Sequence, residues 1–284
     1  MTGLLKSLED LRADKVVIDF GLTPDQLAAL ASSPNVKVVR FTYPYDFPAK
    51  RQAGAVMPGF GAMLARPYLN EFSKDYEVAL WLDADVWVQD PQAIEMLVSE
   101  AARFGIAAVP EIDRSYFKFV GGQHVWNLEA QVTERIFGRE IAGKMYLVPT
   151  FNVGVLAIRS DSPVWNTWRQ YLQKGLLRIS AIDGHTRCVE QIAFNFVTRL
   201  GNLAVRSFPA TFNWLVCLGR PAWDAQRRLL VEPSPPYESL KLVHLSTHVL
   251  DRIGSLACVN SDKDEQVSTS LDFFSIKALR DREM

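Results

Sequence analysis

The spacing of apolar residues predicts alternating strands and helices in the first part of the chain. Short apolar runs at 15–19 and 36–41 are typical of strands. Between them Thr23, Pro24 and Asp25 supply a helix cap, a proline at the first helical position and an acidic first turn. A strand, a helix and a second strand in this order indicate parallel strands joined by a crossover helix.

The same pattern continues as far as residue 244. Further helices are expected over 61–72, 91–104 and 190–200, and around Trp165, Trp168 and Leu172, which recur at helical spacing. Further strands are expected at 78–82, 106–109, 151–158, 203–208 and 240–244. We therefore expect one α/β domain over residues 1–260, built on a mostly parallel sheet. Residues 261–284 are charged and polar, and they predict a peripheral C-terminal tail.

Composition narrows the range of partners. The chain has 284 residues, 48% of them hydrophobic, and 31 basic against 32 acidic residues give a formal net charge of −1. Nucleic acids and anionic membranes require clustered Lys and Arg, so this balance argues against both as main partners. A local basic pocket for a small anion is still compatible with it.

The lack of recognisable targeting signals and the pattern of cysteines predict a cytoplasmic protein. No stretch approaches the roughly 18 apolar residues of a membrane-spanning helix, so no transmembrane segment is expected, and the acidic residues near Met1 argue against a signal peptide. Cys188, Cys217 and Cys258 are odd in number and form no C-x-x-C pair, which favours reduced thiols over a disulfide or zinc framework.

Two carboxylates follow the apolar run at 78–82. Asp83 and Asp85 are two residues apart, so an extended chain would direct both side chains to one face. Ligands of open α/β sheets bind beyond the carboxyl ends of strands, and paired carboxylates there suit Mg²⁺ or Mn²⁺. The other interpretation is a pair of loop aspartates that cap the next helix, although Asp90 and Pro91 already offer that helix a cap.

These residues belong to a series of segments that resembles a known family. LWLDADV at 80–86 resembles the D-x-D segment of GT-A-fold glycosyltransferases, especially those of family 8. Further segments similar to that family follow the expected order, and together they cover about residues 15 to 248. They are VIDFGLT at 17–23, RP at 66–67, FNVGV at 151–155, EQIAFN at 190–195 and LVH at 242–244.

The resemblance implies a Rossmann-like GT-A fold with a mixed, mostly parallel sheet. It implies a glycosyltransferase that moves a sugar from a nucleotide-diphosphate sugar, such as a UDP-sugar, to a hydroxyl acceptor with retention of configuration. Asp83, Asp85 and His244 would bind Mn²⁺ or Mg²⁺, which would neutralise the departing diphosphate. Asn152 and Gln191 would be the catalytic residues that face the reacting sugars.

Arg66 and Glu190 are two further candidates for donor binding. Arg66 would share the charge of the diphosphate, and its other interpretation is a solvated helix residue. Glu190 would bond a sugar hydroxyl, whereas Gln191 is equally compatible with a polar helix start whose neighbours face the core. The residues before that helix, 183–185, would line the acceptor side or form a simple turn.

Two departures from the family bear on activity. Family members open with a strand and turn that bind the nucleotide, whereas residues 4–8 already resemble the helix that follows. Either the protein continues upstream, or its nucleotide pocket is incomplete. After His244 the family has a lysine that contacts the diphosphate, and here His248 or Arg252 is the candidate replacement.

Other functions use similar patterns. In haloacid dehalogenase-type phosphohydrolases the first aspartate of D-x-D is a nucleophile, but Trp87 occupies the position where they carry Thr or Val. A zinc helix at His244 and His248 lacks the glutamate of H-E-x-x-H. A non-catalytic or weakly active truncated GT-A-fold protein that binds a sugar nucleotide is the main alternative.

Loop residues are expected to select the donor sugar and the acceptor. The loops concerned are 113–144 and 214–223. Trp126, Trp214 and Trp223 lie in them and would stack on a sugar ring or, as is commoner for tryptophan, belong to the core. The sequence does not specify the oligomeric state.

Overall fold

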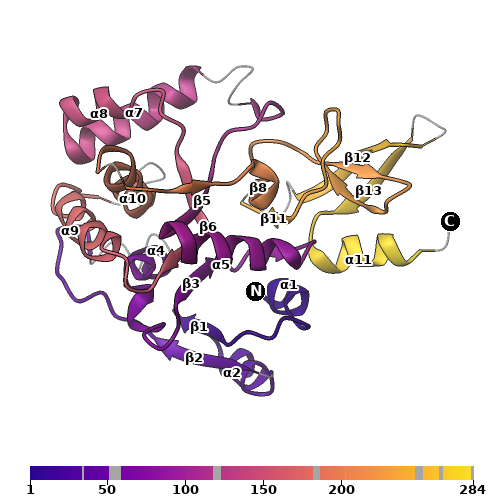
Figure 1. Ribbon diagram of the computed structural model, residues 1–284, viewed down its shortest axis with the longest axis horizontal. Helices are drawn as coiled ribbons and strands as arrows, with labels where there is room; N and C mark the ends of the chain where they lie inside the picture. Colours follow the sequence, from indigo (N-terminus) through magenta and orange to yellow (C-terminus); the bar gives the residue numbers. More distant parts are fainter. Residues whose placement is uncertain are drawn as a thin grey trace.

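The computed structural model shows a central sheet flanked by helices, with further sheets beside it (Figure 1). It describes residues 1–33, 35–50, 59–117, 123–181, 186–201, 203–246, 252–261 and 265–282.

The N-terminal part contains a two-stranded parallel sheet with a crossover helix. Its elements are α1 (Thr2–Ser7), β1 (Lys15–Asp19), α2 (Pro24–Ala31) and β2 (Val36–Arg40). β1 and β2 pair in parallel, and α2 joins them. α2 begins at a capping box, in which the Thr23 side chain accepts from the Gln26 N–H and the Gln26 side chain accepts from the Thr23 N–H. The predicted order of strand, helix and strand is confirmed here.

The central sheet has four strands and mixed directions. Across the sheet they are β3 (Val78–Leu82), β6 (Phe151–Arg159), β5 (Ile106–Pro110) and β7 (Arg206–Ser207). β6 pairs antiparallel with both β3 and β5, while β5 and β7 are parallel. Because Val155 pairs with Leu82, the first residues of β6 extend past the end of β3. Asn152 is thereby placed beside the chain that follows Leu82.

Helices cover both faces of this sheet, which explains the unbroken apolar run of β6. The covering helices are α5 (Gln92–Phe104), α9 (Val164–Leu176) and α10 (Val189–Leu200). Leu156 and Ile158 share one core cluster with residues of α9 and α10. Val155 and Ala157 share another cluster with residues of α5. A strand buried on both faces shows no alternation of apolar and polar residues.

Further helices complete the part of the chain around this sheet. They are α4 (Phe60–Ala65), η1 (Arg66–Glu71), α7 (Gln123–Phe137), α8 (Arg139–Met145), η2 (Thr186–Cys188) and η3 (Ala210–Phe212). The helix predicted over 61–72 is therefore present as α4 followed by the 3₁₀ helix η1.

A three-stranded sheet connects the D-x-D segment to the C-terminal half. Its strands, in order, are β4 (Val86–Val88), β11 (Leu242–His244) and β8 (Trp214–Leu215). β11 pairs antiparallel with β4, and His244 lies opposite Val86. This pairing holds His244 against the residue that directly follows Asp85.

The C-terminal part forms a second four-stranded sheet and a helix. Across the sheet the strands are β10 (Leu229–Val231), β9 (Ala222–Asp224), β12 (Ile253–Val259) and β13 (Gln266–Ser270), and α11 (Phe273–Asp281) follows. Leu271 and Ile276 are buried in one cluster with Trp214 and Trp223, and the Trp87 Nε1 donates to the Leu271 carbonyl at 2.9 Å.

This packing corrects the expectation of a peripheral tail. β13 pairs with β12, and the chain that follows packs on the core through Leu271 and Ile276, because a few apolar side chains anchor an otherwise polar segment. Trp214 and Trp223 are buried and belong to the core. The Trp126 side chain lies outside the described part of the chain. The division of the chain at residue 260 stays a prediction.

The observed fold class is mixed α/β, as predicted, with several sheets and flanking helices. The strand pairs differ from the predicted mostly parallel sheet, because β6 is antiparallel to both β3 and β5. Within the described ranges, none of the helices combines the length and apolar character needed to cross a membrane.

Candidate functional site

The D-x-D segment forms a tight turn at the end of β3. The Asp83 N–H donates to the Gly154 carbonyl at 2.8 Å, and the Val86 N–H donates to the Asp83 carbonyl at 2.9 Å. The extended conformation considered for this segment therefore ends at Asp83, because the chain turns to enter β4. The turn still directs the carboxylates of Asp83 and Asp85 toward one point.

His244 meets both carboxylates from β11. Its Nε2 lies 3.7 Å from Asp83 Oδ2 and 3.4 Å from Asp85 Oδ1. One atom of each residue lies within 4.8 Å of the other two. The Leu245 N–H also donates to the Asp85 carbonyl at 2.9 Å, which fixes β11 against the turn. The structure thus brings together the three residues predicted as metal ligands.

Gly154 permits this convergence. A Cβ at position 154 would overlap Cε1 of His244 and would lie 2.8 Å from both Asn152 Oδ1 and Asp83 Oδ2. No larger residue fits there unless these side chains move. Sequence reasoning included Gly154 only as part of FNVGV, and its role depends on a three-dimensional approach that spacing does not reveal.

Arg66 connects two acidic residues behind the turn. Its Nη2 donates to both oxygens of Asp83, at 2.5 and 2.7 Å, and its Nη1 bonds Glu190. The side chain of Arg66 is only 8% exposed, so the alternative of a solvated helix residue does not describe it. Burial lowers the pKa of Arg66, but Asp83 and Glu190 outweigh burial and raise it above its ordinary value. We call Arg66, Asp83 and Glu190 the ion side of the site.

Glu190 is the most deeply buried member of the ion side. It lies in the first turn of α10, and its side chain is 1% exposed. Burial raises its pKa, and the nearby charge of Arg66 opposes that rise. Its Oε2, like Nε of Arg66, has no hydrogen-bond partner among the described residues. The observed contact of Glu190 is thus the arginine, and its predicted bond to a sugar stays a prediction.

A second set of polar side chains lies at the start of β6. Glu111 Oε1 accepts from Asn152 Nδ2 at 2.9 Å and from Gln191 Nε2 at 3.0 Å. Asn152 Oδ1 accepts from Asn213 Nδ2 at 2.9 Å, and Asn213 Oδ1 lies 2.9 Å from Nδ1 of His244. We call Glu111, Asn152, Gln191, Asn213 and His244 the amide side.

Sequence reasoning named Asn152 and Gln191 but missed Glu111 and Asn213. Glu111 directly follows β5, just as Asp83 directly follows β3, so a carboxylate at a strand end was an available signal. Asn213 had no such signal, because it lies between η3 and β8 in a region of short elements.

The site opens toward Asp85. The side chain of Asp85 is 37% exposed, against 19% for Asp83 and 5% for His244. Burial raises the pKa of Asp85, but the hydrogen bond and charge that the His244 ring supplies when both of its nitrogens carry protons, together with the charge of Arg252, hold it below its ordinary value. Arg252 Nη2 is 3.6 Å from Asp85 Oδ2.

Arg252, one of two predicted replacements for the lysine of the family that the sequence resembles, lies beside Asp85. The other candidate, His248, lies outside the described residues, as do 183–185 of the predicted acceptor side. A contact of Arg252 with a diphosphate stays a prediction.

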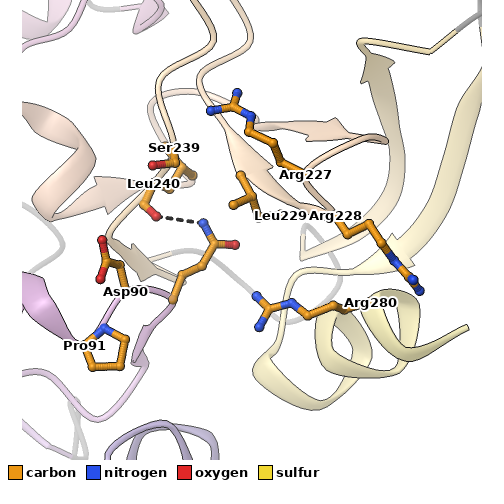
Figure 2. A pocket seen from close by; sticks show the side chains of 9 residues that line it. Asp90, Pro91, Arg227, Arg228, Leu229, Ser239, Leu240 and Arg280 are labelled. Carbon is orange, nitrogen blue, oxygen red and sulfur yellow. Dashed lines mark hydrogen bonds between the residues drawn. The ribbon is translucent and has the colours of Figure 1, made fainter.

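A separate cavity of about 330 Å³ lies beside the C-terminal sheet (Figure 2). Arg227, Arg228 and Arg280 line it, but their guanidinium groups point in different directions (Figure 2). Arg227 is held by Asp224 at 2.6 Å. The cavity contains none of the predicted site residues, so the candidate site is the cluster at the end of β3.

Comparison with known proteins finds distant structural likenesses, among them two transferases. No protein-family model matches the chain, and no curated protein matches its sequence. Mouse xyloside xylosyltransferase 1 in its apo form is similar with a TM-score of 0.44 and 15% identity, over 86% of this chain and 88% of that chain. A mannose-1-phosphate geranyltransferase from Thermus thermophilus is similar with a TM-score of 0.35 and 14% identity, over 97% of this chain and 85% of that chain. At these values neither likeness establishes a shared fold or activity.

Proposed function

We propose that this protein is a metal-dependent glycosyltransferase with a GT-A-like domain, and that it transfers a sugar from a nucleotide-diphosphate sugar to a hydroxyl acceptor. The observation that carries the proposal is the convergence of Asp83, Asp85 and His244 at the end of β3. The family resemblance of the segments that contain these residues supplies the substrate class.

The donor set suits a hard divalent cation. Two carboxylate oxygens and one imidazole nitrogen match the preferences of Mn²⁺ and Mg²⁺, and three protein ligands leave positions for a diphosphate. Asp83 Oδ1 accepts from Arg66 and from Trp81 Nε1, the latter at 2.6 Å. Oδ2 accepts from Arg66 at 2.7 Å and also faces His244, so it is the oxygen that would bind the ion.

The chemistry of sugar transfer explains why such a site is useful. When the bond between sugar and phosphate breaks, a bound divalent ion neutralises the charge that develops on the diphosphate. Arg66 would add positive potential from behind Asp83, since its own hydrogen bonds are already committed to Asp83 and Glu190. Arg252, beside the exposed Asp85, would face the diphosphate from the open side.

The amide side would hold the reacting sugars. Asn152 and Gln191 share one acceptor, Glu111, which holds both side chains in place near the ligand cluster. Groups held by other residues align a substrate without reorganising during reaction. Gln191 would position the sugar rather than act as a base, because an amide accepts no proton at neutral pH. Retention of configuration is part of the proposal through the family resemblance.

The phosphohydrolase alternative is less compatible with the geometry. A nucleophilic aspartate needs an oxygen free to attack phosphorus. Asp83 instead accepts hydrogen bonds on both oxygens from Arg66, which lowers their nucleophilicity. Phosphate release from p-nitrophenyl phosphate that disappears in Asp83→Ala would favour the phosphohydrolase.

Turnover of nucleotide sugars tests the proposal. The full chain is incubated with a set of UDP- and GDP-sugars and Mn²⁺, with and without hydroxyl acceptors, and release of the nucleoside diphosphate is measured. We expect release with at least one donor, inhibition by EDTA, and loss in Asp85→Asn. Binding of a donor without any release would instead identify a non-catalytic sugar-nucleotide-binding protein.

A further inference from the structure

His244 presents one ring nitrogen to the carboxylates and the other to a buried asparagine. Its Nδ1 lies 2.9 Å from Oδ1 of Asn213. Asn213 is 1% exposed and His244 is 4% exposed, so water does not replace this contact. A neutral imidazole carries its proton on one nitrogen only, and the partner of Nδ1 selects which nitrogen that is.

A chain of amides determines which atom of Asn213 faces the ring. The backbone N–H of Gly154 can only donate, so the Asn152 atom at 2.8 Å from it is the carbonyl oxygen. The NH₂ group of Asn152 therefore points the other way, where it donates to Glu111 at 2.9 Å. The Asn152 carbonyl is also 2.9 Å from the Asn213 amide, which must turn its NH₂ group toward it.

The orientation of Asn213 then sets the protonated nitrogen of His244. Because the NH₂ group of Asn213 is committed to Asn152, its carbonyl oxygen faces Nδ1 and requires a proton there. Nε2 keeps its lone pair, which faces the two carboxylates. A lone pair and two carboxylates repel one another unless a cation lies between them.

We propose that Asn213 is a positioning residue that holds neutral His244 in the Nδ1-protonated tautomer. Glu111 and the Gly154 N–H are the fixed ends of the chain that orients it. Without a bound cation, the carboxylates of Asp83 and Asp85 favour a proton on Nε2, so the tautomer of the metal-free protein measures whether the contact with Asn213 prevails. The consequence for metal binding rests on the function proposed above. Outer partners of ligating histidines are typically worth about 10- to 100-fold in metal affinity.

Nitrogen NMR of the histidine rings tests the tautomer directly. The full chain is labelled with ¹⁵N-histidine without metal, and His244 is assigned from the signal lost in His244→Gln. Spectra are recorded over a pH series that extends to the neutral ring. We expect the proton on Nδ1. Asn213→Leu should populate the Nε2-protonated form, and Asn213→Asp, which keeps an acceptor at Nδ1, should restore the original one.

A control separates positioning from loss of stability. Gln89 bonds the backbone of Leu230 and Leu240 through its side-chain amide, and these bonds involve neither His244 nor Asn213. Gln89→Leu removes a comparable amide, and it should leave the His244 tautomer unchanged. A neutral His244 protonated on Nε2 in the unchanged protein would overturn the proposal, and so would an Asn213→Leu protein that keeps the Nδ1 proton. Should Asn213→Leu fail to fold, the unchanged protein and Asn213→Asp still decide the outcome.

Mn²⁺ titration of the same proteins tests the consequence. We expect Asn213→Leu to bind Mn²⁺ about 10- to 100-fold more weakly than the unchanged protein, and Asn213→Asp to bind it nearly as well. The predicted tautomer in a protein that binds no Mn²⁺ would refute the proposed metal site and leave the positioning role standing. Mn²⁺ binding that Asn213→Leu leaves unchanged would contradict the consequence for metal affinity.

Discussion

The ion side and the amide side support the same cluster by different physical means. On the ion side, buried charges hold Asp83 in place, and each charge depends on its neighbours. On the amide side, neutral hydrogen bonds orient His244, and the carboxylate of Glu111 anchors the chain. Within the described part of the chain Arg66 Nε and Glu190 Oε2 lack hydrogen-bond partners. In contrast, the NH₂ group and the carbonyl oxygen of the Asn213 side chain each have one.

Substitutions on the two sides are therefore expected to have different effects, on the stability of the fold for the ion side and on the orientation of side chains for the amide side. Removing one member of a buried ion cluster leaves an uncompensated charge, which is costly. Removing one member of a hydrogen-bonded amide chain mainly frees its neighbours to turn. We therefore expect ion-side variants to affect folding first, and amide-side variants to affect metal binding first.

The largest expected effect is on the ion side. Arg66→Met should lower the free energy of unfolding by about 3–5 kcal/mol, because Asp83 and Glu190 lose their shared counter-charge. Urea denaturation measures it. Arg66→Lys is the matched control, since it keeps the charge but loses the fork that reaches both acids, and it should cost less. A loss in Arg66→Met no greater than that in Arg66→Lys would show that the ion side does not depend on charge.

The next largest effect is expected from Gly154→Ala, at a position that meets both the ion side and the amide side. Gly154→Ala places a Cβ against His244 and Asp83, so it should cost about 1–3 kcal/mol and weaken Mn²⁺ binding. Gly143→Ala is the control, because nothing lies within 4 Å of its Cβ position in α8. The control should be neutral or stabilising by about 0.5–1 kcal/mol. Equal Mn²⁺ affinity in both proteins would contradict the close approach at Gly154.

The smallest expected effect is that of Glu111→Gln on the amide side, which is compared with the same change at Glu190 on the ion side. Glu190→Gln removes a buried charge beside Arg66 and should cost about 1.5–3 kcal/mol. Glu111→Gln keeps a carbonyl that accepts from the same two amides, so it should cost at most about 1 kcal/mol. Thermal and urea denaturation measure the stability of both variants. A larger loss in Glu111→Gln than in Glu190→Gln would contradict the distinction between the two sides.

The sequence predicted the parts of the fold that depend on local pattern. β1, α2, β2, α5, β6 and α10 follow apolar spacing and capping, and their positions are close to those expected. The antiparallel course of β6 was not visible, because an apolar run does not show the direction of its partners. The C-terminal β13 and α11 were missed because their polar surfaces conceal a few buried anchors such as Leu271 and Ile276.

The candidate site shows the same limit. Residues in continuous motifs, such as Asp83, Asp85 and His244, were named from sequence, and the structure brings them together. Glu111 and Asn213 act through partners that are distant in the chain, with Glu111 bonding Asn152 and Asn213 bonding His244. Spacing carries no record of such contacts.

Metal-dependent donor binding is the central claim, and calorimetry tests it most directly. UDP-sugars are titrated into the full chain and into Asp85→Ala, each with and without Mn²⁺. We predict donor binding that requires Mn²⁺ in the unchanged protein and is lost in Asp85→Ala, which removes one of the three converging ligands. Strong donor binding without metal, or Mn²⁺-dependent binding that Asp85→Ala retains, would contradict the claim.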